Sequence, residues 1–268
     1  MGHRLRILGT SLALLLPASA HEESVARLAE LEALIATLPD QPLLLVRRAD
    51  IAIEHGEWDA AERDLRAATR LDPALPELAA SWARLHLGAG RPAEAREALT
   101  RVLAQRPDDA ETLVLRGRAS AQAGDAAAAR LDYDRALAQL ATPPPELFLE
   151  RARLPLAPDE LLAGLDQGLA TVGPVIGLLE RAIAIELSIA RYDAALARVA
   201  ALTAAAESKA PWLRRRGDIL AAAGRPDEAR AAYADALAEL RRLPAWLQSS
   251  PDSLRLATEL VQLIPPST

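Results

Sequence analysis

The sequence contains no cysteine, one phenylalanine and few other aromatic residues. Without cysteine the chain can form no disulfide, no thiolate zinc site and no cysteine nucleophile, so its stability must come from packing. The scarcity of aromatic residues disfavours a β-sheet protein, and the abundance of alanine favours helices, because alanine is the strongest helix former. The formal net charge of −6 disfavours binding to nucleic acid.

Catalytic motifs are also missing. The chain has no His-Glu-x-x-His, no Gly-x-Ser-x-Gly and no glycine-rich phosphate loop. His55 and His86 fall near the ends of the first helices of two adjacent predicted helix pairs, where a metal pair is conceivable, but ordinary packing is favoured because no ligand spacing accompanies them. We therefore expect no cofactor, no metal site and no enzyme activity.

The clearest pattern in the sequence is a regular spacing of prolines. Pro39, Pro73 and Pro107 each lie 34 residues apart. A fixed period of roughly 20 to 50 residues is typical of a stacked repeat array. Small residues recur in the same register, where two helices of a repeat must approach closely: Ala49, Ala83 and Gly117 in the first helix, and Ala61, Ala95 and Ala129 in the second.

Glycines mark the turn within each repeat. Gly56, Gly90 and Gly124 are predicted to end the first helix of a pair, since glycine adopts the left-handed conformation at little steric cost. The pattern returns at Gly224, and around Arg191 it returns without its glycine. Each unit therefore reads as a helix-turn-helix.

With this period and these small residues the chain resembles the tetratricopeptide repeat family over nearly all of residues 21–268. The resemblance implies an all-α, right-handed α-solenoid of about six repeats with capping helices. The repeats are expected at about 42–75, 76–109, 110–143, 145–174, 176–209 and 210–243, with caps at 24–35 and 252–264. In the short fourth repeat, Pro155 should interrupt a first helix about three residues short, and packing there should be poorer. The fifth repeat is diverged.

Residues 1–20 have the pattern of a signal peptide. Arg4 and Arg6 precede an apolar run from Ile7 to Leu16, and small residues lead to Ala20. We expect cleavage after Ala20 and a periplasmic or secreted bacterial protein. The alternative is an uncleaved anchor, but the apolar run is shorter than the roughly 20 residues that span a bilayer. Contact with a membrane is thus expected only through this segment during export.

The family resemblance also implies a concave groove lined by the first helices. Arg84, Arg118 and Arg153 would form a line suited to the carboxylates of a peptide, because guanidinium binds carboxylate through two hydrogen bonds. Alternatively, these arginines pair with neighbouring acidic side chains. The groove positions that the resemblance gives are Val46, Asp50, Ile53, Arg84, Leu87, Arg118, Arg153, Arg214 and Asp218.

A second set of arginines occupies a slot where the family usually carries leucine: Arg48, Arg116, Arg151 and Arg216. Buried arginine is rare unless it is paired. We expect their stems to pack between helices while their guanidinium groups reach acids of the second helices, such as Asp64 and Asp132. This set is predicted to be structural.

The predicted function is that of an exported, non-enzymatic scaffold that binds a protein or peptide in its groove. The repeat domains that clamp a chaperone's terminal carboxylate use lysine and asparagine, whereas this chain has only Lys209 and no asparagine. An enzyme or enzyme subunit acting on a cell-envelope polymer is an alternative, but Asp50 and Asp218 are four repeats apart, too far for paired carboxylates. A small-molecule sensor is a third. The partner and the oligomeric state stay open.

Overall fold

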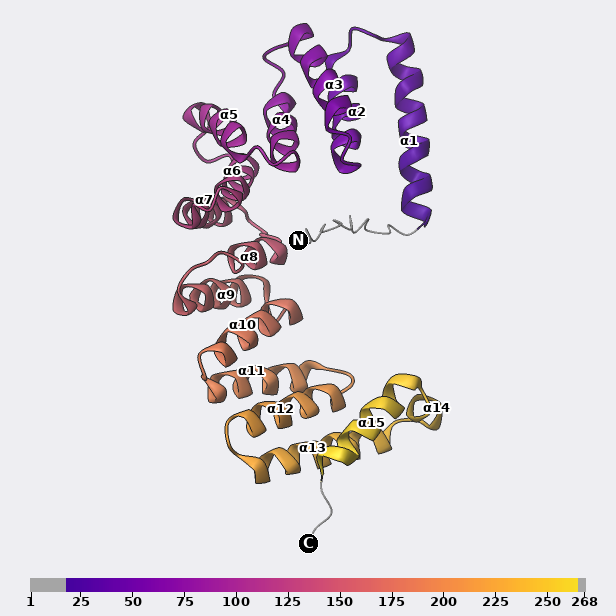
Figure 1. The fold of residues 1–268 in the computed structure, drawn as a ribbon, viewed down its shortest axis with the longest axis vertical. Coiled ribbons are helices and arrows are strands. Elements are labelled where there is room, and N and C mark those ends of the chain that lie inside the picture. The colour runs from indigo at the N-terminus through magenta and orange to yellow at the C-terminus, as the bar shows by residue number, and fades with distance from the viewer. Residues whose placement is uncertain (1–17, 265–268) are drawn as a thin grey trace, which may run out of the picture. The chain divides into compact units, whose positions relative to one another are not determined.

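The computed structural model describes residues 18–264, and the chain divides into two compact units, one ending at Pro107 and the other beginning at Asp108. Throughout the described residues the regular structure is helical (Figure 1), so the predicted all-α fold is confirmed. The first unit contains α1 (Ala18–Thr37), α2 (Pro42–Glu54), α3 (Trp58–Leu71), α4 (Glu77–Gly88) and α5 (Pro92–Gln105).

The second unit continues the same kind of structure. Its helices are α6 (Ala110–Gln122), α7 (Ala126–Gln139), α8 (Pro145–Arg151), α9 (Pro158–Val172), α10 (Ile176–Ser188), α11 (Tyr192–Ala205), α12 (Ala210–Ala222), α13 (Pro226–Arg242), α14 (Ala245–Gln248) and α15 (Pro251–Leu263).

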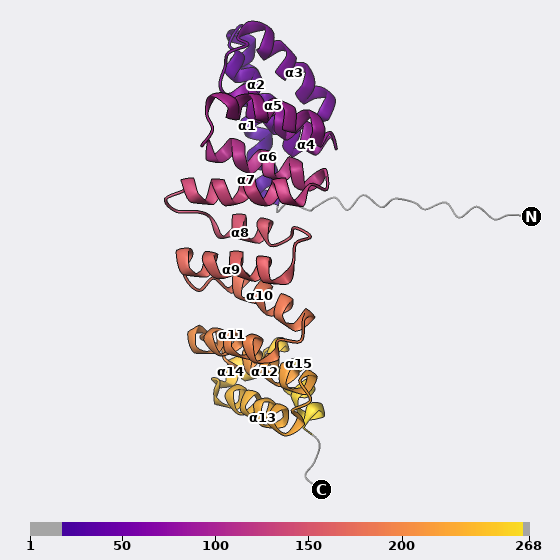
Figure 2. The ribbon, with the colours of Figure 1, turned by 90° about the vertical axis from the view of Figure 1, so that its left-hand side faces the viewer.

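Consecutive helices pack in pairs. We call α2, α4, α6, α8, α10 and α12 the A helices, and α3, α5, α7, α9, α11 and α13 the B helices. Each A helix packs against the B helix that follows it, and within each unit a B helix also packs against the next A helix. Figure 2 shows the helices of the second unit stacked one after another from α7 to α13. Within each unit, neighbouring pairs thus cover the apolar faces of one another.

The turns inside five of the six pairs follow one geometry, and the turn between α8 and α9 is the exception. At the end of α2, Gly56 has a φ of 75° and Glu57 N donates to Ala52 O at 2.8 Å. This six-to-one hydrogen bond defines a Schellman motif and satisfies a carbonyl that the helix leaves open. The left-handed glycines predicted from the sequence are therefore confirmed. The diverged repeat has the same hydrogen bond from Arg191 N to Glu186 O, with Ala190 in place of glycine at a φ of 56°.

Small residues lie at the contact between the helices of a pair. Ala61, Ala95 and Ala129 are completely buried. At Gly117 an added Cβ would lie 3.1 Å from Cε1 of Tyr133, and at Gly217 it would lie 2.2 Å from the same atom of Tyr233. The tyrosine rings therefore use space that any larger residue on the A helix would occupy.

The fourth repeat agrees with its prediction in part. Helix α8 has 7 residues, against 12 or 13 in the other A helices, and it ends at Arg151, four residues before Pro155. As predicted, the packing of α8 against α9 is less extensive than in the other pairs, although Phe148 and Leu154 are buried. Helix α9 has glycine where it faces α8: a Cβ at Gly168 would lie 2.9 Å from Phe148 Cγ. Because α9 approaches α8 closely at this glycine, the side chains of the shortened helix α8 are still buried.

In the part of the chain that the structure describes, three helices lie outside the six pairs. Helix α1 packs against α2, and α15 packs against α13 after the short helix α14. Residues 1–17, which make up most of the predicted signal peptide, lie outside the described residues. Within residues 18–264 no helix has the length and apolar character needed to cross a membrane.

Candidate functional site

The predicted groove positions of the first unit lie on α2 and α4. Asp50 and Arg84 approach each other across these neighbouring A helices, with 3.6 Å between Oδ1 and Nη1. Ile53 and Leu87 are half-buried. Val46 is a correction to the sequence analysis: it is 1% exposed and so offers no surface to a partner. It is buried because α1 packs against α2 and Ile35 joins the same apolar cluster.

In the second unit, the carboxylate of Glu150 on α8 contacts side chains of α6 and α7. Arg118 donates from Nε and Nη2 to the two oxygens of Glu150, at 2.8 and 2.7 Å. The hydroxyl of Tyr133 lies 3.4 Å from the same carboxylate. These hydrogen bonds raise the pKa of Arg118, and burial followed by the charge of Glu150 raises the pKa of Tyr133. The guanidinium of Arg118 is therefore bound within its own unit.

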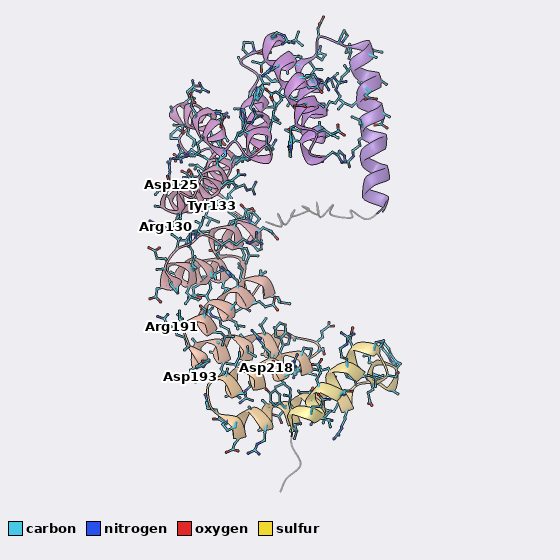
Figure 3. All side chains as sticks on the ribbon, in the orientation of Figure 1. Asp125, Arg130, Tyr133, Arg191, Asp193 and Asp218 are labelled. Carbon is cyan, nitrogen blue, oxygen red and sulfur yellow. The ribbon has the colours of Figure 1, made fainter. Side chains whose placement is uncertain are left out.

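A related cluster lies at α12. The Tyr233 hydroxyl donates to Asp218 at 3.1 Å, and burial together with this carboxylate raises the pKa of Tyr233 to about 12. Arg214 lies beside Asp218 and extends to Glu259 of α15, with 3.5 Å between Nη1 and Oε2. Figure 3 places Asp218 part-way along α12, while Asp125 and Arg191 mark the edge where the A–B turns lie.

A hollow of about 370 Å³ opens between α10 and α12 beside this cluster. The Nε of Arg214 is buried there, 3.7 Å from Asp218 Oδ2, and makes no hydrogen bond among the described residues. Arg215 is exposed and forms no ion pair within residues 18–264. The hollow is lined by Glu180, Ile183, Pro211, Trp212, Arg214, Arg215 and Asp218. It thus combines an indole, an open donor and a free guanidinium.

The arginines of the predicted groove line therefore differ in their surroundings. Arg84 faces a carboxylate of the preceding A helix and Arg118 faces one of the following A helix, each within its own unit. Arg153 is exposed, and its side chain forms no ion pair with the residues that the structure describes. A new anion would have to compete for the first two but not for Arg153.

The second arginine set behaves largely as predicted. Arg48 binds Asp64 through two hydrogen bonds of 2.7 Å, and Arg116 binds Asp132 at 2.8 and 2.6 Å, so the predicted pairings are confirmed. The pKa of both arginines is raised, first by these hydrogen bonds. Arg151 instead reaches Asp134 of the preceding B helix and Glu160 O. These contacts join helices and present little charge to solvent.

Arg216, the last of this set, departs from the prediction. It is exposed and has no hydrogen-bonded acid among the described residues. The slots of Asp64 and Asp132 correspond to Ala232 in its own repeat, so the carboxylate that holds the other arginines is missing.

His86 packs among side chains of the first unit. The ring of His86 stacks on Trp82 with centroids 5.5 Å apart, and Nδ1 is buried without a hydrogen-bond partner in the described chain. Burial, followed by the charge of Arg91, lowers the pKa of His86. Within residues 18–264 no group of three or more histidine, aspartate or glutamate side chains could hold a metal ion.

Several residues of these clusters were missed by the sequence analysis. Glu150 and Glu259 come from other helices than the arginines they bind, and Trp212 adjoins a predicted position without occupying one. A signal for the tyrosines was present, because Gly117 and Tyr133 recur as Gly217 and Tyr233 in the last repeat. The positions of Glu150 and Glu259 are not indicated by such a recurrence in the sequence.

Family models match two parts of the chain: a tetratricopeptide repeat over residues 80–143, and a tetratricopeptide repeat-like domain over residues 169–254. Together they span more than half of the sequence, and the chain belongs to the tetratricopeptide repeat family. Proteins of this family generally mediate protein–protein interactions. No curated protein sequence matches the chain.

Solved structures support the fold. A tetratricopeptide repeat protein from Parabacteroides merdae is 18% identical, with a TM-score of 0.53, and the match covers 92% of this chain and 94% of that one. The C-terminal part of a repeat protein from Cytophaga hutchinsonii is 13% identical, with a TM-score of 0.62 and coverage of 88% and 95%. The Cut9–Hcn1 hetero-tetramer is 14% identical with a TM-score of 0.54, and 48% of that chain is covered. At these identities the likeness shows the fold alone.

Proposed function

We propose that this protein is an exported, non-enzymatic scaffold that binds an extended segment of a partner protein on the A-helix side of its second unit. The observation that carries the proposal is the hollow beside α12, where Arg214 Nε is a buried donor without an acceptor. A buried donor without a partner is costly, and a carbonyl or carboxylate of a bound peptide would satisfy it. Arg215 adds a free positive charge at the same place.

The lining of the hollow favours a particular kind of segment. Its volume is at the lower end of the range for ligand sites, which suits one or two side chains of a peptide rather than a large cofactor. The indole of Trp212 offers an apolar surface, and the two arginines offer charge-assisted hydrogen bonds. We therefore expect a partner segment with an acidic residue next to an apolar one.

The proposal of a scaffold without enzyme activity rests on the carboxylates. Asp50, Glu150 and Asp218 each lie against an arginine of their own unit. Such pairs connect neighbouring helices, whereas acid–base catalysis requires a carboxyl group directed at a substrate. No observation favours the envelope-polymer enzyme over the scaffold.

Site-specific photo-crosslinking tests the binding surface. A photoreactive amino acid at position 180, at the hollow, should capture a discrete partner in cells. The matched control is position 230, an exposed arginine on α13 outside the hollow. The double variant Arg214→Glu, Arg215→Glu should abolish capture, and Arg63→Glu, Arg70→Glu, at two exposed arginines on α3, should not. Equal capture from position 230, or capture that survives the first double variant, would refute the proposed site.

Export is tested separately. Fractionation of the producing cells followed by mass spectrometry of the amino terminus should find a periplasmic or secreted protein that begins at His21. Recovery of an uncleaved chain in the cytoplasm would contradict export while leaving the binding surface untouched.

A further inference from the structure

Helix α15 occupies the place of an A helix without a B helix of its own in the described chain. It packs on α13, the last B helix, with Leu260 fully buried. Its Glu259 lies against Arg214 of α12, as Glu150 of α8 lies against Arg118 of α6. The contacts of α15 with the preceding repeat are therefore those that one A helix makes with another.

The remaining face of α15 is open. On α12, the residues that face the B helix α13 are Leu213, Gly217 and Leu220. Helix α15 has the same spacing of four and three residues at Leu254, Thr258 and Val261. On α12 the last position of this set, Leu220, is buried at 1%, whereas on α15 its counterpart Val261 is 58% exposed and Leu254 is 55% exposed.

These residues line a hollow of about 540 Å³ between α15 and α13. Leu237 and Leu240 of α13 form its other wall. The hollow thus lies where a B helix paired with α15 would pack.

Helix α1 shows the converse arrangement. It packs on α2 as a B helix packs on the next A helix, with Leu31 buried and Ile35 in the adjoining cluster. Leu34 lies 34 residues before Ala68, which is completely buried on α3. Yet Leu34 is 48% exposed and Leu38 is 49% exposed. Helix α1 is therefore a B helix whose face toward its own A helix is uncovered in the described chain.

We infer that α1 of one copy docks into the hollow between α13 and α15 of a second copy, so that the two helices complete a pair between molecules. The apolar positions Leu34 and Leu38 would meet Leu254 and Val261, which removes both sets from water. Charge favours the same match, since Glu30 is exposed on α1 and Arg241 is the one charged residue that lines the described hollow. Because the contact is head to tail, each added copy brings a new free end.

Sedimentation velocity of the protein purified with its natural amino terminus, from about 2 to 200 μM, tests this inference. The wild type should increase in mass with concentration. Leu34→Glu blocks the open face of α1, which we call the head, and Val261→Glu blocks the hollow between α13 and α15, which we call the tail. Each variant alone should stay monomeric over this concentration range. Leu131→Glu is the matched control, since Leu131 is also 55% exposed but lies on α7, and it should associate like the wild type.

Mixing the two blocked variants makes the test specific. The intact head of Val261→Glu should dock on the intact tail of Leu34→Glu and give a one-to-one dimer that grows no further. Circular dichroism should show that all variants are folded. A wild type that is monomeric at every concentration, association of either blocked variant alone, or the absence of a dimer in the mixture would overturn the inference.

Discussion

Ala190 takes the place of the family's left-handed glycine in the turn between α10 and α11, and replacing it with glycine should stabilise the protein. The left-handed conformation costs a residue with a Cβ about 1–2 kcal/mol. Glycine loses more backbone entropy on folding, which offsets about 0.5–1 kcal/mol of this gain. Since the Schellman hydrogen bond from Arg191 N to Glu186 O is already present, no other term should change. We expect Ala190→Gly to add about 0.5–1 kcal/mol.

The matched control is the reverse change at the equivalent turn of the last repeat. Gly224 has a φ of 73°, and no atom lies within 4 Å of a Cβ built there, so Gly224→Ala should cost energy through its backbone alone. We expect a loss of about 0.5–1 kcal/mol by the same reasoning.

Thermal unfolding followed by circular dichroism measures both variants. At about 2–4 °C per kcal/mol for domains of 150–250 residues, the Tm should rise by about 1–4 °C for Ala190→Gly and fall by a similar amount for Gly224→Ala. Because repeats can unfold separately, hydrogen exchange at the two turns should accompany the melt. A Tm for Ala190→Gly at or below that of the wild type, with Gly224→Ala unchanged, would refute the strain argument.

Three further predictions concern close packing and ionisation. Ala95→Leu should destabilise the protein by about 1–3 kcal/mol in urea unfolding, because Ala95 is completely buried between two helices; an unchanged midpoint would contradict the register. Gly164→Ala should cost about 1–3 kcal/mol, since a Cβ there would stand 2.0 Å from Nη1 of Arg151, and Gly177→Ala, where the nearest atom is 3.5 Å away, is the control for the same denaturation series. Tyr233 has a pKa raised from 10.0 to about 12, so its contribution to stability is complete below pH 10 and is lost as the pH rises toward 12; Tyr233→Phe should flatten the decline of Tm over this range, and an unchanged decline would contradict the shift.

Much of the fold follows from the sequence because its signals are local. Each left-handed glycine depends on its own helix end, and the small residues recur at every helix contact with the period of the repeat. The pairing of Arg48 with Asp64 was also predictable, since both lie within one helix pair and recur as Arg116 and Asp132. A repeated contact leaves a repeated pattern, which a single sequence can reveal.

The candidate site was less predictable because its contacts join different repeats. Arg118 is separated from Glu150 by 32 residues, and the period does not indicate which acid will come within reach. The burial of Val46 was also not predictable from the repeat pattern. Its position in the repeat predicts a groove residue, but Val46 is buried in an apolar cluster to which Ile35 of α1 contributes. The hollow beside Trp212 likewise depends on how α10 and α12 pack.

The sequence by itself determined the helix pairs, their turns and the family, because these depend on periodicity, helix propensity and backbone conformation within about 34 residues. Only the tertiary structure decided which arginines are neutralised by carboxylates, which buried donor lacks an acceptor, and which faces of α1 and α15 stay uncovered. The reason is that pairing and burial are set by the separation of helices in space, to within a few ångströms, and repeats with the same pattern differ in the side chains that meet across them.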